Sequence, residues 1–421
     1  MVTFLLSALC AFSQTRTLTL RQTLDLALQQ NPDLVLARLD QERAREAVTL
    51  AKDPFHPKVI LGSGAAYPIG FPASINGAAP SIVQATTQMS LFDRPQTYQI
   101  AEAHENLRGA EIDVAKQQDE IAYQVARLYL DAEQAARNLE VAQRQTASVQ
   151  SVLEIMKTRV EAGRELPLDV KRAEFAVKRA AYSVETARRD LLNAETSLAT
   201  ALGLAPNDRV HAAAEERAPI AIPASEDQAV DAAIEASKEI RRLESSMQAK
   251  MLDIKSYKAQ RLPKASLVAQ SEIFAKYYYQ NYYPVFHTYG GQFGASFELP
   301  VLAGRSARAY ISQDEEDLAK LRVEIARTRS RLAGDIRRGF EEVRYAEAAR
   351  DLANADLDLA REQVSVDLAQ NQEGRLPAAT LEQARAAENE KWLAYYDAMH
   401  QLERARLDVL HQTGTLLSAL R

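Results

Sequence analysis

The chain has 421 residues, of which 47% are hydrophobic and 26% charged, a length that would ordinarily hold two or three domains. Its net charge is -6 at pH 7, with lysine and arginine spread along it, so it lacks the basic patch of a nucleic-acid-binding protein. Six scattered histidines have no partner at metal-ligand spacing, and no phosphate-binding loop, zinc-protease motif or nucleophile elbow occurs. We therefore expect no enzyme activity, no cofactor, no metal and no nucleic-acid partner.

The N-terminal segment predicts export. Residues 2–12 are apolar and Ala11-Phe12-Ser13 offers small residues for a signal peptidase, which predicts a signal peptide over residues 1–13. A disordered tail is the alternative, because no lysine or arginine precedes the apolar run. Leu9 is too large for lipid-anchor cleavage before Cys10. No other apolar run reaches about 18 residues, so the sequence predicts no transmembrane helix.

Segments of the first half recur about 206 to 211 residues later in the same order: 24–28 matches 230–234, 57–59 matches 263–265, and 160–164 matches 371–375. Such a duplication indicates one fold made of two similar halves. We place the first structural repeat at residues 14–204, a linker at 205–226 and the second repeat at 227–421. Elongated halves of this kind bury little surface alone, which favours several chains closing a ring.

Four proline-free stretches predict long helices, at residues 95–167, 167–206, 300–377 and 377–421. Apolar residues recur in a heptad seam from Ile121 to Val160, and a second seam from Val170 to Ala201 has alanine at every other place. Gly163 and Gly374, each followed by a proline, predict turns between consecutive helices. The sequence therefore predicts two antiparallel helical hairpins, the longer arm roughly 95 Å long at 1.5 Å per residue.

Two shorter segments, about 57–92 and about 263–299, change to alternating apolar and polar residues and predict two β-hairpins, four β-strands per chain. A soluble sandwich would alternate in the same way. The aromatic-rich segment 277–289 favours a membrane–water boundary, with an exposed loop or a local core as the alternative. A closed lipid-facing barrel needs at least eight strands, so four per chain imply an oligomer.

The expected fold class is mainly α with β. Residues 18–32, 90–94, 163–170 and 374–381, in this order within a tandem duplication, make the chain similar to the TolC family of bacterial outer-membrane efflux and secretion channels. The resemblance implies a homotrimer whose 12 strands form a β-barrel in outer-membrane lipid, continuous with an α-helical barrel that extends into the periplasm. It also implies a passive exit duct for small molecules or proteins, with a periplasmic adaptor (membrane fusion) protein and an inner-membrane pump as partners.

The resemblance also implies that the turns of the hairpins form the periplasmic entrance and dock the adaptor. The residues it assigns there are Gly163, Arg164, Leu166, Asp169, Gly374, Arg375, Leu376 and Glu382. Asp169 matches an entrance acid of the family. Thr380 and Gln383 stand where acids are usual, and Leu376 stands where a locking arginine would be, so Glu382 or a different closure would have to substitute. The alternative function is a periplasmic coiled-coil adaptor or scaffold, which would not need two alternating hairpins with an aromatic loop.

Overall fold

The computed structural model describes residues 15–64, 81–163, 166–205, 208–213, 220–223, 225–274, 289–300, 305–373 and 375–420. The chain divides into two compact units. The first consists of Met1–Ala37, Val114–Lys238 and Thr328–Arg421, and the second of Arg38–Asp113 and Glu239–Arg327. Each unit therefore takes pieces from both halves of the sequence. The predicted signal peptide and the aromatic residues of 277–288 lie outside the described residues.

The helices confirm the internal duplication, because their lengths repeat in order. Helices α1 and α5 have 11 residues each, α2 and α6 have 21 and 22, α3 and α8 have 68 each, and α4 and α9 have 35 each. Their bounds are α1 Leu20–Gln30, α2 Pro32–Lys52, α3 Arg94–Glu161, α4 Pro167–Ala201, α5 Glu226–Ala236, α6 Lys238–Ala259, α8 Arg305–Gln372 and α9 Ala378–Gln412, with a short α10 at Leu416–Leu420 and a 3-10 turn, η1, at Asp53–Phe55. A 68-residue helix extends about 100 Å.

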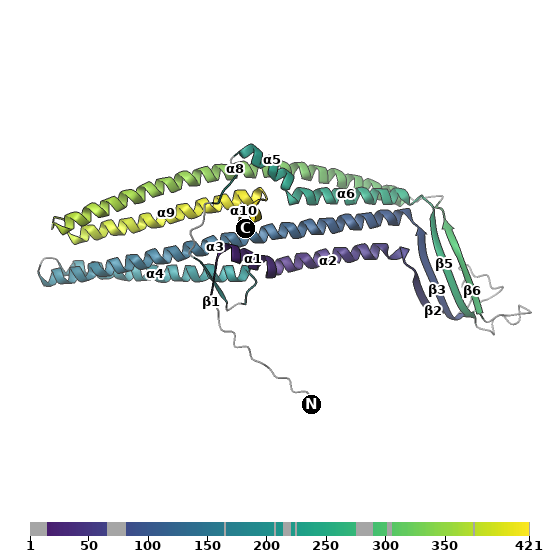
Figure 1. Ribbon diagram of the computed structural model, residues 1–421, viewed down its shortest axis with the longest axis horizontal. Helices are drawn as coiled ribbons and strands as arrows, with labels where there is room; N and C mark the ends of the chain where they lie inside the picture. Colours follow the sequence, from purple (N-terminus) through teal and green to yellow (C-terminus); the bar gives the residue numbers. More distant parts are fainter. Residues whose placement is uncertain are drawn as a thin grey trace, which may run out of the picture. The chain divides into compact units, whose positions relative to one another are not determined.

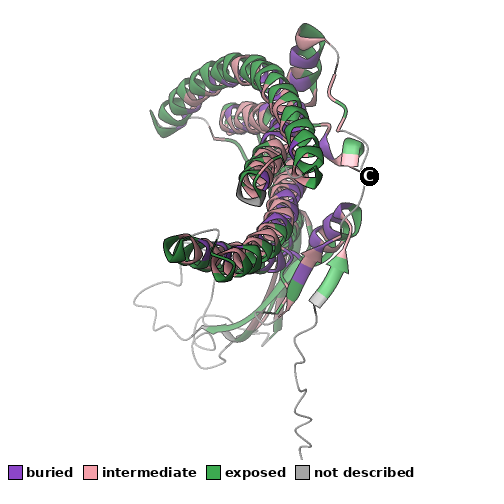
Figure 2. Cartoon of the chain, turned by 90° about the vertical axis from the view of Figure 1, so that its left-hand side faces the viewer, coloured by how far each residue is buried: buried purple, intermediate pink, exposed green. Residues whose placement is uncertain are grey.

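The predicted helical hairpins are confirmed: α4 lies along α3 and α9 along α8 (Figure 1). Two alanines of the second seam, Ala173 and Ala180, are buried, and Ala187, Ala194 and Ala201 are partly exposed. On α8, a Cβ added at Gly339 would lie 2.9 Å from a Val409 methyl group, so this seam position needs glycine for the close approach of α9. Exposed residues cover the outer faces of these helices (Figure 2).

The four long strands form one antiparallel sheet in the order β2-β3-β5-β6, with bounds β2 Lys58–Gly64, β3 Ser81–Phe92, β5 Lys264–Phe274 and β6 Tyr289–Glu298. The two predicted hairpins are thus joined through β3 and β5. Thr87 lies opposite Ala269, and Ala269 lies opposite Phe293, so these three side chains share one face. Strands β2 and β6 form the two edges of this four-stranded sheet.

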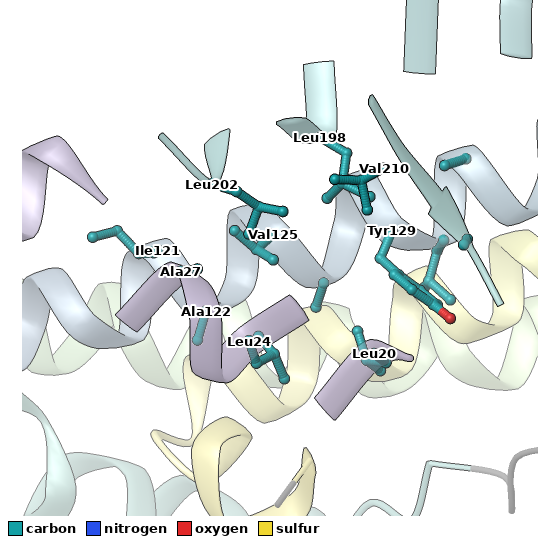
Figure 3. Packing of buried hydrophobic residues seen from close by; sticks show 14 of the residues in the cluster. Leu20, Leu24, Ala27, Ile121, Ala122, Val125, Tyr129, Leu198, Leu202 and Val210 are labelled. Carbon is teal, nitrogen blue, oxygen red and sulfur yellow. The ribbon is translucent and has the colours of Figure 1, made fainter. Parts of the chain in front are cut away.

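Four strands per chain was an incomplete prediction. A further two-stranded parallel sheet pairs β1 (Thr15–Leu18) with β4 (Arg209–Ala212), and β4 lies inside the segment 205–226 that we expected to be a linker. This sheet covers a core in the first unit (Figure 3), formed by residues including Leu20, Leu24, Ala27, Ile121, Val125, Tyr129, Leu198, Leu202 and Val210.

Asn31 explains part of the sequence motif at 18–32. Its side-chain amide donates to the Ala201 carbonyl at 2.7 Å, and its carbonyl oxygen accepts from the Asp33 N–H at 2.8 Å. The residue therefore begins α2 and ties it to the end of α4. Gly203 lies at this junction with φ of +71°, and a Cβ added to it would lie only 3.0 Å from the Gln30 carbonyl oxygen. The ends of the first repeat meet here.

Candidate functional site

The first hairpin turn exposes glycine and leucine. Gly163 has φ of +68°, its N–H donates to the Val160 carbonyl at 3.0 Å, and a Cβ built on it meets no atom within 4 Å. Leu166, which precedes α4, is 65% exposed. Asp169 accepts from the Leu166 N–H at 3.3 Å and from Arg172 at 3.2 Å, so it caps α4. Arg164 lies outside the described residues.

The second turn is closed mainly by polar contacts. The Arg375 N–H donates to the Gln370 carbonyl at 2.9 Å, and the Arg375 guanidinium lies 3.1 Å from the Glu373 carboxylate. Asn371 donates to the Leu376 carbonyl at 2.8 Å, and Leu376 is half-buried. Gly374 lies outside the described residues. Each turn thus places one leucine beside charged or polar side chains, and Leu166 is the more exposed of the two leucines.

Glu382 does not lie on an open turn surface. Its side chain is 10% exposed, and its carboxylate accepts from the Ser148 hydroxyl at 2.5 Å and from Arg385 at 2.9 Å. Ser148 lies on α3 and Glu382 on α9, so this bond joins the first hairpin to the second. The structure therefore brings together Glu382 and α3, a contact that the sequence did not predict.

More polar contacts join α3 to α9 along the same seam. Gln134 donates to Asp397 at 2.5 Å, and Asp131 lies 3.0 Å from the His400 ring nitrogen. The Tyr123 hydroxyl donates to Asp408 at 2.6 Å. Burial, together with the hydrogen bond to Asp408 and the charge of that carboxylate, raises the pKa of Tyr123 to about 12. The contact between the two hairpins is thus rich in hydrogen bonds and ion pairs.

Two more contacts extend this seam. His411 stacks on Tyr123 with ring centroids 4.2 Å apart, and its Nε2 lies 3.4 Å from Glu120. Arg144 lies over the Trp392 ring, 5.9 Å from its centroid. His400 and His411 thus each contact a carboxylate on a neighbouring helix. The sequence carries no periodic signal for such pairs.

A groove of about 450 Å³ opens between α3, α4 and α9. Its lining includes the carboxylates of Asp131, Asp190 and Asp397 and the small residues Ser183 and Ala187. The alanine seam of α4 is therefore tightly packed at Ala180 but open at Ala187. Among the described residues, no group of three or more histidine, cysteine, aspartate or glutamate side chains is arranged to hold a metal ion.

One face of the four-stranded sheet is apolar and uncovered in the single chain. Tyr289, Phe293 and Phe297 alternate along β6 and are each more than 75% exposed. On the opposite face Gln292 donates to Gln270 at 2.8 Å. The register confirms the predicted division into an apolar and a polar face. No described helix is long and apolar enough to cross a membrane.

Two exposed apolar stripes run along α4 and α8 at seven-residue spacing. The first consists of Leu168, Phe175 and Tyr182, and the second of Tyr345, Leu352, Leu359 and Val366. Between 167 and 182, α4 has four basic and two acidic residues, whereas between 351 and 372, α8 has one basic and five acidic residues. The stripes and their opposite charges make the two helices complementary, and our sequence analysis, which followed the internal seams, missed both.

Comparison with known proteins finds similar sequences among outer membrane efflux proteins. Residues 23–204 match the sequence model of the family described as outer membrane efflux protein. Over 373 residues the chain is 23% identical to the outer membrane efflux protein BepC of Brucella suis, covering 83% of this chain and 74% of BepC.

Solved structures share the fold at low sequence identity. The Campylobacter jejuni CmeC outer membrane channel superposes with a TM-score of 0.74 at 15% identity, covering 94% of this chain and 86% of CmeC. The outer membrane protein VceC of Vibrio cholerae superposes with a TM-score of 0.72 at 15% identity, covering 94% of this chain and 96% of VceC. The similarity spans the helices and the sheet together.

Proposed function

We propose that the chain is a member of the outer membrane efflux protein family and that it forms the outer-membrane channel of a tripartite efflux or type I secretion system, a passive duct that an inner-membrane pump supplies. Its place is the outer membrane, with the helices extending into the periplasm. BepC is named an outer membrane efflux protein and CmeC an outer membrane channel, and these names favour a channel over the alternative of a soluble periplasmic adaptor. The observation that carries the proposal is the exposed apolar face of a four-stranded sheet whose strands β3 and β6 are followed in the chain by the 68-residue helices α3 and α8.

The sheet supports a trimer because it cannot be stable in lipid as a single copy. Its edge strands β2 and β6 carry backbone N–H and C=O groups that lipid would leave without hydrogen bonds. Three copies joined edge to edge would form a closed barrel of 12 strands, more than the eight strands of the smallest membrane barrels. The face with Phe293 and Phe297 would contact lipid, and the face with Gln292 would line the pore.

The stripes on α4 and α8 supply the matching contact between the helices of neighbouring copies. Counted from Gly163, the α4 stripe lies 5, 12 and 19 residues along the chain. Counted back from Gly374, the three α8 stripe residues nearest the turn, Val366, Leu359 and Leu352, lie 8, 15 and 22 residues away. The offset of three residues is constant, about 4.5 Å at 1.5 Å per residue. The α4 stripe of one copy therefore interdigitates with the α8 stripe of the next, antiparallel and with opposite net charge.

At the periplasmic end, the hairpin turns dock the adaptor, and the polar contacts between α3 and α9 hold the two hairpins together. Leu166, which is 65% exposed, offers the periplasmic adaptor a small apolar anchor, repeated around the ring so that weak contacts add up. The bond of Glu382 to Ser148 and its companions along α3 and α9 hold the two hairpins of one copy together. Polar contacts of this kind can exchange with water at modest cost, so this seam is where the duct can widen.

Cysteine crosslinking in intact cells tests the trimer. Leu168→Cys together with Val366→Cys should give covalent trimers in the outer membrane, because the single native cysteine, Cys10, lies in the predicted signal peptide. Each single substitution is the control and should give none. If the double variant inserts into the membrane but gives only monomers, the proposed contact between α4 of one copy and α8 of the next is wrong.

Export tests the docking turn. Gly163→Glu should abolish export and leave folded trimers, since it places a bulky charge at the exposed turn. Gly334→Glu is the matched control on α8, where the nearest atom to an added Cβ is 3.8 Å away, and it should export normally. Normal export by Gly163→Glu would show that this turn does not dock a partner.

A further inference from the structure

The four long strands meet the helices of the second unit at one edge of the sheet. Strands β2 and β5 begin at this edge, with Lys58 and Lys264, and strands β3 and β6 end at it, with Phe92 and Glu298. Helices α2, α3, α6 and α8 all reach the same edge (Figure 1). We call the connecting segments the sheet base, and it consists of residues 52–58, 93–98, 257–264, 298–300 and 305–310.

The sheet base is strongly basic in an acidic chain. It contains eight lysine or arginine residues and three aspartate or glutamate residues, whereas the whole chain has a net charge of -6. No single segment of the base is a basic run, so the excess arises only when the fold brings the segments together. A local excess of positive charge attracts anions to this level of the structure.

The acids of the sheet base neutralise only part of this charge. Lys58 forms an ion pair with Asp53, and Lys264 Nζ lies 3.2 Å from Asp93. The other six cations are exposed, and none of them forms an ion pair with a carboxylate of the residues that the structure describes. These unpaired cations are Lys52, Arg94, Lys258, Arg261, Arg305 and Arg308.

Tyrosines accompany the unpaired cations. Arg94 lies over the Tyr98 ring, 5.3 Å from its centroid. Tyr257, next to Lys258 in the chain, stacks on Tyr310 with ring centroids 5.0 Å apart, and Tyr310 is 50% exposed. Tyrosine favours the boundary between hydrocarbon and water, because its ring is apolar and its hydroxyl group is polar. The aromatic residues therefore indicate an interface with lipid independently of the charges.

The apolar face of the sheet ends directly at the sheet base. Phe297, which is 79% exposed, immediately precedes Glu298. In the proposed outer-membrane channel this face contacts hydrocarbon, and the helices leave on the periplasmic side. The chain thus passes within one or two residues from the hydrocarbon to the level of the lipid headgroups, where the unpaired cations lie.

We propose that the six unpaired cations bind the phosphate groups of anionic phospholipids in the periplasm-facing leaflet of the membrane. A guanidinium group donates two parallel hydrogen bonds to a phosphate, and a lysine ammonium supplies a compact positive charge. The bound lipids fix the depth of the sheet in the membrane, because a shift in either direction takes the cations away from the phosphates. This inference rests on the proposed channel function and adds a ligand class to it.

The net charge of the lipid distinguishes this binding from contact with any phospholipid. Phosphatidylglycerol has a net negative charge, whereas the choline group of phosphatidylcholine cancels the charge of the same phosphate. One lysine or arginine beside an anionic lipid surface contributes about fivefold in affinity. The contribution is screened over about 8 Å at physiological salt, so it should weaken as salt is added.

Native mass spectrometry of the full-length protein, extracted in detergent, tests the proposal. The protein is mixed with equal amounts of phosphatidylglycerol and phosphatidylcholine that have the same acyl chains. At low salt, the wild type should retain phosphatidylglycerol about fivefold more often, and the ratio should fall toward one at high salt. Inorganic phosphate, added at constant ionic strength, should leave the preference unchanged.

Matched triple variants assign the effect to the sheet base. Arg261→Gln, Arg305→Gln and Arg308→Gln together should lower the preference at least about twofold, because half of the unpaired cations are removed. Arg43→Gln, Arg322→Gln and Arg327→Gln together are the control. These three arginines are also exposed and lie in the same unit, at least nine residues from the sheet base, and their triple variant should bind as the wild type does.

A second pair of substitutions covers the case in which the first triple variant does not fold. Lys52→Gln with Lys258→Gln should then lower the preference in the same direction.

Equal binding of the two lipids by the wild type would overturn the proposal and leave these cations to an acidic protein partner. Loss of the preference on adding inorganic phosphate would overturn it in favour of a free-phosphate site. Equal losses in the two triple variants would also overturn it. Failure of the channel proposal is a separate result, since the protein would then not be extracted with the outer membrane.

Discussion

Replacing Ala180 by leucine tests the close packing of the helical hairpins. Ala180 is 7% exposed on the seam that α4 turns toward α3, and leucine adds three carbon atoms there. A filled seam can accept them only by shifting the helices or straining rotamers, which costs on the order of 1–3 kcal/mol. An exposed position would change by less than about 0.5 kcal/mol.

Ala187 provides the matched comparison, one heptad further along the same seam. The sequence alone treats the two alanines alike, whereas the structure opens Ala187 to the groove of about 450 Å³ beside Ser183 and Asp190. A leucine fits there without overpacking, and the roughly 0.8 kcal/mol that each buried methylene could contribute is offset by the polar lining. We therefore expect Ala187→Leu to be close to neutral.

Thermal unfolding of the purified variants in one detergent provides the measurement. Ala180→Leu should melt clearly below the wild type, and Ala187→Leu should melt within error of it. Equal losses would show that the groove closes in solution. An unchanged melting temperature for Ala180→Leu would place the alanine seam on a solvated face and remove the argument for close helix approach.

Three other substitutions test separate parts of the structure. Phe293→Arg should cost about 2–4 kcal/mol near the membrane midplane and lower the yield of folded outer-membrane protein, whereas Gln292→Arg on the polar face should be tolerated; equal damage would refute the register. Gly163→Ala should cost about 1–2 kcal/mol in thermal unfolding because φ is +68°, and no loss would mean that the turn rearranges. Tyr123→Phe should remove a step near pH 12 from the ultraviolet phenol titration, and an unchanged titration would contradict the buried bond to Asp408.

Elements with a regular period could be predicted from the sequence. The seam from Val170 to Ala201 and the alternation along β6 each repeat often enough that the buried face and the register follow from spacing alone. The turn at Gly163 could be predicted because a positive φ needs glycine. The helical hairpins and the four-stranded sheet could therefore be predicted from these features.

Short or long-range features could not be predicted. Strands β1 and β4 have four residues each, too few to alternate, and Thr15 pairs with Arg209 about 190 residues away. The bond of Glu382 to Ser148 links two helices that are distant in the chain, and one polar contact has no period. The exposed stripe through Phe175 has a heptad period, and it was overlooked because the neighbouring alanine seam accounts for the helix by itself.

Electron cryomicroscopy of the protein, extracted from the outer membrane and placed in lipid nanodiscs, tests the central claim most directly. The account predicts three copies around one axis, with the face bearing Phe293 against the lipid and the α4 stripe of each copy against α8 of the next. Single copies, or a sheet lying outside the disc, would contradict it.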